Sequence, residues 1–365
     1  MRREILSSRE RVQLALQHQA TDRIPIAMVC SLINPPAYQA LAEHLRRQRG
    51  LSVQAYLDSF IDIREVAPTY MGPPLKPGED IWGVIRSPVS YGVGSYDEIA
   101  WYPEKQTSFF QVEAKNLGDL KTHRWPSPNW FDYDSLTGRI AIAQAESERC
   151  LMVTNGNIFE TTWYMRGFQQ IFMDFVLNPE LAHTILGGVT DFYIQYFTRL
   201  LETASGAVDL VFTADDIAGQ SGLLMSLKMW EEFIKPYHAR LNKAIHEFGV
   251  GVIYHSDGAV MEAVGGLVEM GIDVLQALQF SADGMNPRML KRKYGDCLCF
   301  EGGVSVQTTL PFGTPQDVQR ETEELIRVLG KNGGYILGPS HSIQAGTPPE
   351  NILAMFDTAL NFYPY

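Results

Sequence analysis

Short apolar runs alternate with amphipathic segments along most of the chain, and this alternation predicts repeated strand-helix units. Each run ends in a polar residue and is followed by residues that start a helix. The number of runs matches the eight strands of a (β/α)8 TIM barrel, although a doubly wound open sheet would give the same pattern strand by strand. The predicted strands are 23–28, 61–68, 151–157, 210–218, 251–259, 274–279, 298–305 and 335–341.

Capping residues mark the predicted helix starts. Ser7 and Glu10 form the Ser-x-x-Glu pattern of a capping box. Thr314 and Thr347 are each followed by proline, with an acidic residue at the third helical position, so we expect both threonines to be N-caps. Further helices are expected to start near Asn178, Ser226 and Asn286, the second of them continuing as one long helix to Gly249.

The stretch 72–134 interrupts the alternation. It is rich in Pro, Gly, Trp and Tyr, which makes it too aromatic for disorder and too broken for long helices. We predict an elaborated insertion beside the barrel mouth, acting as a lid or a dimer contact. Its GVGS piece lacks the glycine spacing and the following helix of a dinucleotide-binding fingerprint. Apart from this insertion we expect one domain over residues 1–365, because barrels of this size fold as single units.

Composition narrows the class of protein. The chain is 45% hydrophobic and 20% charged, which is typical of a globular protein and excludes a disordered or fibrous one. Its formal charge of −12, without a strong cluster of basic residues, argues against a nucleic-acid partner. No apolar run approaches the roughly 18 residues of a membrane span, and residues 1–13 lack the apolar stretch of a signal peptide. We therefore expect a cytoplasmic protein without a membrane partner.

The four cysteines are too few and too scattered for a disulfide framework. Cys297 and Cys299 form a Cys-x-Cys pair that could hold a metal, but they lie in the apolar run CLCF. Small buried side chains are the more common role of cysteine in such a run. We interpret Cys30, Cys150, Cys297 and Cys299 as reduced, structural cysteines.

Polar residues that could take part in catalysis or metal binding lie at the predicted strand ends, which is where barrel enzymes place their catalytic groups. His255 and Asp257 are two positions apart and so share a face, whereas Asp215 and Asp216 point to opposite faces. Each residue alone has a structural alternative, since an aspartate often caps a helix and a histidine is often a hydrogen-bonded core residue. Their convergence on one rim favours function. The remaining strand-end candidates are Asn155, Asn157, Gln279, Glu301 and His341.

An apolar stripe follows the strand at 151–157. Met165, Phe168, Phe172, Met173 and Phe175 form it, and such a stripe is more often core than a cofactor box. Trp163 and Tyr164 lie closer to the strand end, and we expect them to form a wall of the substrate site, together with Asn155, Asn157, Asp215 and Gln279.

Several segments together make the chain resemble the uroporphyrinogen decarboxylase superfamily, which also contains corrinoid-dependent methyltransferases of the O-demethylase type. The likeness covers nearly the whole chain and implies a (β/α)8 barrel that commonly forms homodimers. The segments that carry it are RERVQLALQHQATDRIPI (9–26), NPELAHTIL (178–186), YHSDGAV (254–260), EMGIDVLQ (269–276), LPFGTPQDV (310–318) and GPSHSIQAGTPPENI (338–352).

Within the superfamily the residues favour the methyltransferase branch. True uroporphyrinogen decarboxylases carry an arginine-containing RQAGRY-type segment shortly after the first strand, whereas this chain has no arginine between Arg23 and Arg46. The methyltransferase branch typically holds zinc with a His-x-Cys pair and a later cysteine. The matching positions here are His255, Asp257 and His341, so both thiolates are replaced by other zinc ligands, and Glu301 could complete the set.

The leading hypothesis is a methyltransferase that takes a methyl group from a small methoxylated or methylated compound and passes it to a corrinoid. His255, Asp257, Asp216 and His341 are the predicted catalytic residues, with His255 or His341 as proton donor where no metal acts. We expect the corrinoid on a partner protein, because the chain offers no second domain for it. A decarboxylase of a smaller or tetrapyrrole acid, with Asp215 or Asp216 stabilising a cationic intermediate, and a non-catalytic ligand-binding barrel are the alternatives.

Overall fold

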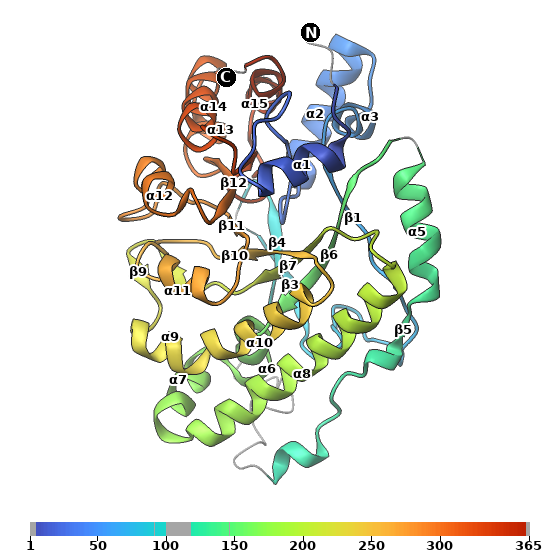
Figure 1. Cartoon of the computed structure of the whole chain (residues 1–365), viewed down its shortest axis with the longest axis vertical. Coiled ribbons are helices and arrows are strands. Elements are labelled where there is room, and N and C mark those ends of the chain that lie inside the picture. The colour runs from blue at the N-terminus through green and yellow to red at the C-terminus, as the bar shows by residue number, and fades with distance from the viewer. Residues whose placement is uncertain (1–4, 91, 100–117, 146, 363–365) are drawn as a thin grey trace.

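The computed structural model describes residues 5–90, 92–99, 118–145 and 147–362. Its centre is a curled parallel sheet with the strand order β1-β6-β7-β10-β11-β12-β13. Figure 1 shows this sheet at the middle of the molecule, with helices around it. The bounds are β1 (Ile63–Glu65), β6 (Cys150–Asn157), β7 (Leu210–Ala214), β10 (Gly251–His255), β11 (Val274–Gln276), β12 (Cys299–Val304) and β13 (Tyr335–Pro339).

The segment around Ile26 closes the sheet into a barrel. On one side Ala27 N donates to Leu337 O of β13 at 2.9 Å, and Ile26 forms a parallel bridge with Leu337. On the other side Asp62 N, just before β1, donates to Ile26 O at 2.9 Å. The predicted eight-stranded barrel is thus confirmed. Because both edges of the sheet are joined through this segment, the open doubly wound sheet is excluded.

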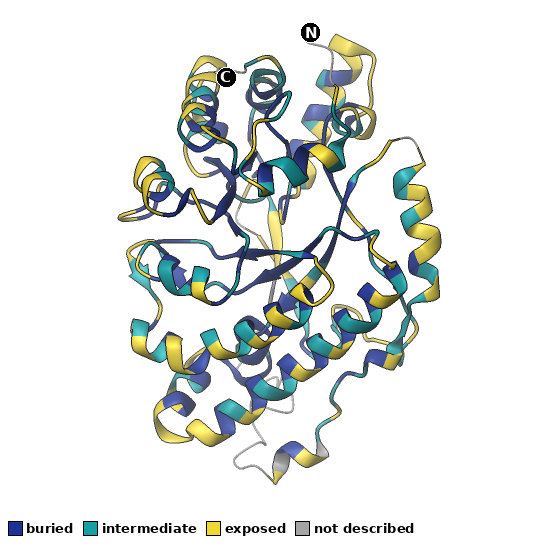
Figure 2. Cartoon of the chain, in the orientation of Figure 1, coloured by how far each residue is buried: buried dark blue, intermediate teal, exposed yellow. Residues whose placement is uncertain are grey.

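Helices pack on the outside of the barrel, and their exposed faces point away from it (Figure 2). Before the third barrel strand and directly after it lie α1 (Ser8–Leu16), α2 (Pro35–Arg49), α3 (Val53–Asp58), α5 (Asp134–Gln144), α6 (Phe159–Arg166), α7 (Phe168–Leu177) and α8 (Pro179–Ala204). The remaining helices are α9 (Leu227–Phe233), α10 (Lys235–His246), α11 (Val264–Glu269), α12 (Pro287–Tyr294), α13 (Thr309–Phe312), α14 (Pro315–Leu329) and α15 (Pro349–Asn361).

The predicted helix starts are mostly confirmed. Ser7 and Thr314 each form a capping box with the acidic residue three positions later. Ser226 caps α9, but the chain breaks at Ile234 into α9 and α10, so the single long helix expected up to Gly249 was wrong. The N-cap expected at Thr347 was also wrong. Pro348 occupies that position, because a helix that begins at Pro349 leaves Thr347 one residue too early.

Two apolar clusters form the core. One fills the barrel interior and includes Cys150 and Cys299, which agrees with their interpretation as structural cysteines. The other lies between the strands and the surrounding helices. The strands of the parallel sheet appear mostly dark blue, meaning buried, in Figure 2. An eight-stranded barrel is just wide enough for side chains to fill it, so the C-terminal ends of the strands are where a ligand can enter.

A buried ion network fixes the first barrel segment. Asp62 is fully buried, and its two carboxylate oxygens each lie 2.7 Å from a guanidinium nitrogen, one of Arg11 and one of Arg23. Ile26 N also donates to Asp62 Oδ2 at 2.8 Å. Breaking such a network leaves uncompensated buried charge, which costs about 3–5 kcal/mol. These contacts therefore hold the segment that leads to Cys30.

Short elements occupy the described part of the predicted insertion at 72–134, of which residues 91 and 100–117 lie outside the described residues. Strand β2 (Thr69–Tyr70) pairs with β5 (Phe131–Asp132), and β3 (Arg86–Ser90) forms a hairpin with β4 (Ser95–Ile99). Two 3-10 helices, η1 (Asp119–Thr122) and η2 (Pro128–Trp130), follow, and a further small pair is β8 (Ala218–Gly219) and β9 (Gly222–Leu223). Among the described residues, no helix combines the length and the apolar character required of a membrane span.

Candidate metal centre and active site

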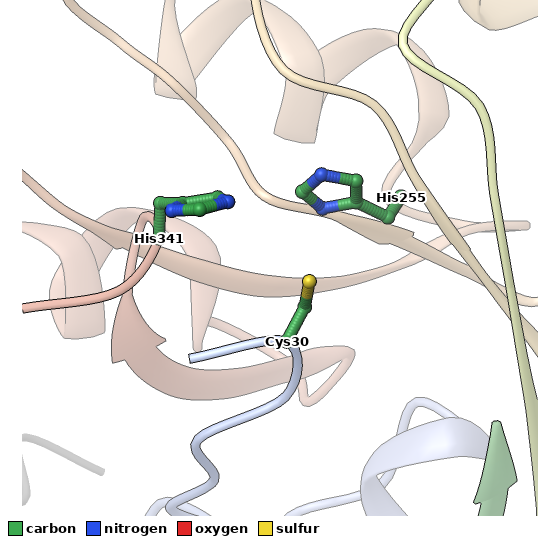
Figure 3. A group of neighbouring side chains, drawn as sticks. All are labelled: Cys30, His255 and His341. Atoms are coloured by element: carbon green, nitrogen blue, oxygen red, sulfur yellow. The ribbon is translucent and has the colours of Figure 1, made fainter. Parts of the chain in front are cut away.

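Three potential metal ligands meet at the barrel mouth. One donor atom each from Cys30, His255 and His341 lies within 4.8 Å of the other two. They come from the turn after the first barrel segment, the last residue of β10 and the loop after β13. Figure 3 shows the Cys30 sulfur pointing toward the two imidazole rings. A thiol and two imidazoles are the donor types that zinc prefers, and three protein ligands leave one position open.

Cys30 lies in a left-handed backbone conformation, with φ +50°. This conformation is uncommon for a residue with a Cβ and is often found at functional sites. Although the residue as a whole is exposed, loss of solvation around the sulfur, followed by the charge of Asp257, raises the pKa of the thiol to about 12. A bound divalent cation would reverse this, because a thiol that coordinates a metal is deprotonated.

His255 is held by hydrogen bonds on the inner side of the cluster. Its Nδ1 is hydrogen-bonded to Gln276 Oε1, and Gln276 Nε2 donates to Val29 O at 3.0 Å. The other ring nitrogen, Nε2, lies 3.6 Å from Asp216 Oδ1. Burial alone would lower the pKa of His255, but the charges of Asp257 and Asp216 outweigh it and raise that pKa. The hydrogen bond to Nδ1 orients the ring, as is usual for metal-binding histidines.

Two carboxylates adjoin the histidines. Asp216, His255 and Asp257 form a second group whose donor atoms lie within 4.8 Å of one another. Asp257 N donates to Asp216 Oδ1 at 2.8 Å, which ties the loops after β7 and β10 together. Burial raises the pKa of Asp257 and lowers that of His341. The structure thus brings together all four predicted catalytic residues.

Glu301, predicted as a metal ligand, belongs to neither group among the described residues. It lies in the middle of β12, pairs with Ile336 and is fully buried inside the barrel. Burial raises the pKa of this carboxyl well above its usual value, which favours its neutral form. The strand pattern predicted its face correctly but not its depth, and the structure gives no support to Glu301 as a ligand.

Asp215, predicted to contact substrate or a cationic intermediate, has an internal role instead. It is fully buried, and its two oxygens each accept a backbone N–H at the start of α6, from Phe159 and Glu160, at 2.8 Å. One oxygen also lies 2.5 Å from His238 Nε2. Asp215 therefore holds α6 and α10 against β7. The structure gives no support for a contact between Asp215 and substrate.

The other predicted substrate-binding residues divide into two groups. Asn155, Asn157 and Tyr164 line a pocket of about 540 Å³ beside the end of β6. Trp163 packs against the Tyr164 ring, with centroids 4.2 Å apart, and supports the wall from behind. Gln279 accepts a hydrogen bond from Gly258 N at 2.9 Å and donates to Gln307 at 2.9 Å, so it connects loops at the mouth.

A second pocket, of about 720 Å³, is lined in part by residues of the two potential metal-binding groups. It is lined by Asp257 and His341, and by Phe312 and Val93 at its outer edge. Both of these apolar side chains are exposed. The titratable cluster thus has a pocket on its β13 side, in addition to the aromatic pocket beside β6.

Sequence reasoning missed two residues of this site. Cys30 follows the run RIPIAMV, so the rule that polar groups at strand ends are functional would have selected it, had it not been interpreted as a structural cysteine. Glu160 lies in the first turn of α6, three residues beyond Asn157, and is 8% exposed. A glutamate at a helix start is usually a solvated partner of the helix dipole, so the sequence carried no signal of its burial.

Comparison with known proteins places the chain in a family. The family model described as uroporphyrinogen decarboxylase (URO-D) matches residues 101–362. A methylated-thiol–coenzyme M methyltransferase from Methanosarcina mazei is 28% identical over 234 residues, which are 62% of this chain and 59% of that protein. A uroporphyrinogen decarboxylase from Anaeromyxobacter dehalogenans is 31% identical over 202 residues, 54% of this chain and 53% of that protein.

These matches span between half and three fifths of the length of the two curated relatives. Among solved structures, a methyltransferase from Methanosarcina mazei superposes with a TM-score of 0.68 at 16% sequence identity, covering 98% of this chain and 99% of that one. At this identity the superposition establishes the fold. Since the family model covers most of the chain and the fold agrees, the chain belongs to the uroporphyrinogen decarboxylase (URO-D) family.

Proposed function

We propose that this chain is a methyltransferase that takes a methyl group from a small methylated compound, such as a methyl ether, and passes it to the cobalt of a corrinoid on a separate protein. The cluster of Cys30, His255 and His341 at the barrel mouth is the observation that carries this proposal. Support also comes from the likeness to a coenzyme M methyltransferase. The homodimer and the cytoplasmic location remain predictions.

The donor set fits zinc. Cys30, His255 and His341 offer one sulfur and two nitrogen atoms, and Asp257 lies close enough to His255 to serve as a fourth ligand or to hydrogen-bond a ligand. Zinc bound here would supply a Lewis acid that polarises the oxygen of a methyl ether. The chain's own residues then have defined tasks. Gln276 orients His255, and the reactants enter through the pocket lined by Asp257 and His341 and through the aromatic pocket beside β6.

Metal analysis of two cysteine variants tests the proposed centre. Cys30→Ser removes a thiol donor, so we expect about one equivalent of zinc in the wild type and well under one in this variant, in protein purified without chelator or an affinity-tag metal. Cys297→Ser is the matched control, because Cys297 is exposed and lies outside both potential metal-binding groups, and it should retain the metal. Full zinc content in Cys30→Ser would exclude the thiol as a ligand.

Methyl transfer itself is tested with a reduced corrinoid protein and a panel of methyl ethers. The corrinoid absorbance spectrum should change from that of Co(I) to that of methyl-Co(III). His255→Ala should abolish the change while the variant stays folded, because it removes a ligand from the cluster. Unchanged activity of His255→Ala would show that the histidine is structural.

A further inference from the structure

The aromatic pocket beside β6 has the character of a site for a small, mostly apolar molecule. Its volume of about 540 Å³ falls within the range of about 300–1,000 Å³ that such sites occupy. Asn155, Asn157 and Tyr164 provide polar groups on the barrel side. The aromatic walls consist of Tyr70, Trp82, Phe131, Phe192, Tyr193 and Tyr196.

Glu160 lies directly behind the polar side of this pocket. Its Oε1 accepts a hydrogen bond from the Tyr164 hydroxyl at 3.0 Å, and its Oε2 accepts one from Asn157 Nδ2 at 2.6 Å. Both partners line the pocket. The backbone of Glu160 is fixed by the bond from its N–H to Asp215. A buried carboxyl is thus joined to the pocket by two direct hydrogen bonds and is held in place from behind.

The charges around Glu160 favour its protonated form. Burial, followed by the charges of Asp216 and Asp215, raises the pKa of this carboxyl to about 7, although His255 and the Asn157 hydrogen bond act in the opposite direction. The acid is therefore poised to gain and lose a proton near neutral pH, which is where a proton donor works best.

Arg86 is the cation that faces Tyr164. Its guanidinium carbon lies 4.8 Å from the centroid of the Tyr164 ring, and the group is paired with Asp80 at 2.6 Å. Burial and the adjoining Glu160 raise the pKa of the Tyr164 hydroxyl. Tyr164 therefore passes a proton on only if Glu160 supplies one to it.

Demethylation of an ether needs a proton from somewhere. When methyl leaves, the oxygen retains the electron pair of the broken C–O bond, and an unprotonated alkoxide or phenoxide is a poor leaving group. If His255 and His341 each hold a metal through one ring nitrogen, neither imidazole can take up the second proton that makes it an acid near neutral pH. Among the described residues Asp80 also lines the aromatic pocket, but it is paired with Arg86. The carboxyl there that can donate a proton is Glu160, through Tyr164.

We propose that the Glu160–Tyr164 pair donates the proton to the departing oxygen of an aryl methyl ether bound in the aromatic pocket. This inference rests on the proposed methyl transfer. The C–O bond to the methyl carbon breaks, and the carbon bonds to Co(I) of the partner's corrinoid, which becomes methyl-Co(III). The oxygen takes the hydroxyl proton of Tyr164, and Tyr164 is reprotonated by the Glu160 carboxyl. Glu160 regains a proton from solvent before the next turnover.

The relay predicts opposite pH dependences for substrate and product. An aryl ether only accepts hydrogen bonds, so it binds when protonated Glu160 donates to the Tyr164 oxygen and the Tyr164 hydroxyl is turned to the ether. A phenol donates a hydrogen bond, so it binds when Glu160 is ionised. The Tyr164 hydroxyl then donates to the Glu160 carboxylate, and the Tyr164 oxygen accepts the hydrogen bond from the phenol. Ether affinity should fall, and phenol affinity should rise, as the pH passes through about 7.

Fluorine NMR titrations with 4-fluoroanisole and 4-fluorophenol test this without any partner protein. For a pKa near 7, the protonated fraction of Glu160 falls from about 0.9 at pH 6 to about 0.1 at pH 8, so each affinity should change roughly five- to tenfold, in opposite directions. A phenol's own pKa of about 10 lies outside this window. In Glu160→Gln the side-chain carbonyl keeps the hydrogen bond from Asn157 Nδ2, which turns the amide N–H toward Tyr164. This variant should therefore bind the anisole equally at both pH values and the phenol weakly.

Controls separate this inference from the proposed function. Glu180→Gln changes an exposed glutamate in the first turn of α8 and should keep both pH dependences. Absence of binding by both probes, or a pH dependence that persists in Glu160→Gln, would overturn the assignment. Methyl transfer in the wild type with an unchanged pH profile in Glu160→Gln would refute the relay and retain the function. The predicted binding pattern without any methyl transfer would retain the Glu160–Tyr164 pair as the polar recognition group of the pocket and refute the proposed methyl transfer.

Discussion

Asp215 and Asp216 are neighbours in sequence with opposite surroundings. Asp215 is fully buried and bonded to two backbone amides and to His238, whereas the Asp216 side chain is 42% exposed and faces His255 and Asp257 at the barrel mouth. Strand alternation separates the two faces, and packing assigns each carboxylate its task. One is part of the scaffold and the other is part of the site.

Substitution of each aspartate should therefore affect a different property. Asp215→Ala leaves two backbone amides and His238 without their acceptor, so we expect a loss of about 3–5 kcal/mol in the free energy of unfolding. Asp216→Ala should change stability by less than about 1 kcal/mol and lower methyl-transfer activity instead. Urea denaturation combined with the corrinoid assay distinguishes the two. A fully stable Asp215→Ala protein would contradict this account.

At the scale of elements, the contact between the first barrel segment and β13 decides whether the barrel closes. Gly338 lies in this contact, and a methyl group added there would be 2.6 Å from Ala27 O and 2.7 Å from Glu301 Oε1. Real Cβ atoms do not approach other atoms so closely. The absence of a side chain at this position thus allows the backbone of the first segment to pair with β13.

Gly338→Ala should lower the melting temperature and reduce zinc binding together, since the segment that it displaces leads to Cys30. Overpacking of this kind costs about 1–3 kcal/mol. Gly138→Ala on α5 is the matched control, because a Cβ there meets nothing within 4 Å and alanine favours a helix by up to about 1 kcal/mol. Calorimetric melting of the two variants checks the prediction, which fails if they behave alike.

The eight barrel strands were predictable because each is a short apolar run, and because several of the helices that follow begin at a capping residue such as Ser226, Asn286 or Thr314. Both signals depend only on local sequence. What lies at the mouth was harder to predict. Alternation gives the face of a residue but not its distance along the barrel. Glu301 was therefore grouped with His341, although it pairs with Ile336, which precedes His341 by five positions. Cys30 could have been selected from the sequence as a strand-end residue, whereas Glu160 becomes a functional candidate only when packing buries it.

At the scale of the whole molecule, we propose that the 72–134 segment is an insertion that completes the aromatic pocket. Trp82 from this segment packs against Phe192 and Tyr193 of α8, with ring centroids 5.0 and 5.7 Å apart. Phe131 packs on Tyr196 at 4.8 Å. A barrel with short loops would leave this face of α8 open to solvent. The pocket thus depends on contacts between the barrel and residues that interrupt its strand-helix alternation.

The charge of the mouth predicts that the protein does not decarboxylate uroporphyrinogen, even though decarboxylases of that substrate are among its relatives. Uroporphyrinogen carries eight carboxylates, and recognising them takes several guanidinium or ammonium groups. Among the residues that the structure describes, the lining of the two pockets contains a single such group, Arg86, which is already paired with Asp80. Asp216 and Asp257 at the cluster would repel the substrate further.

Incubation with uroporphyrinogen under reducing conditions should yield no coproporphyrinogen, while the Anaeromyxobacter dehalogenans decarboxylase in a parallel reaction should yield it. Product formation by this chain would mean that carboxylates bind elsewhere on the barrel and that the decarboxylase hypothesis has to replace methyl transfer.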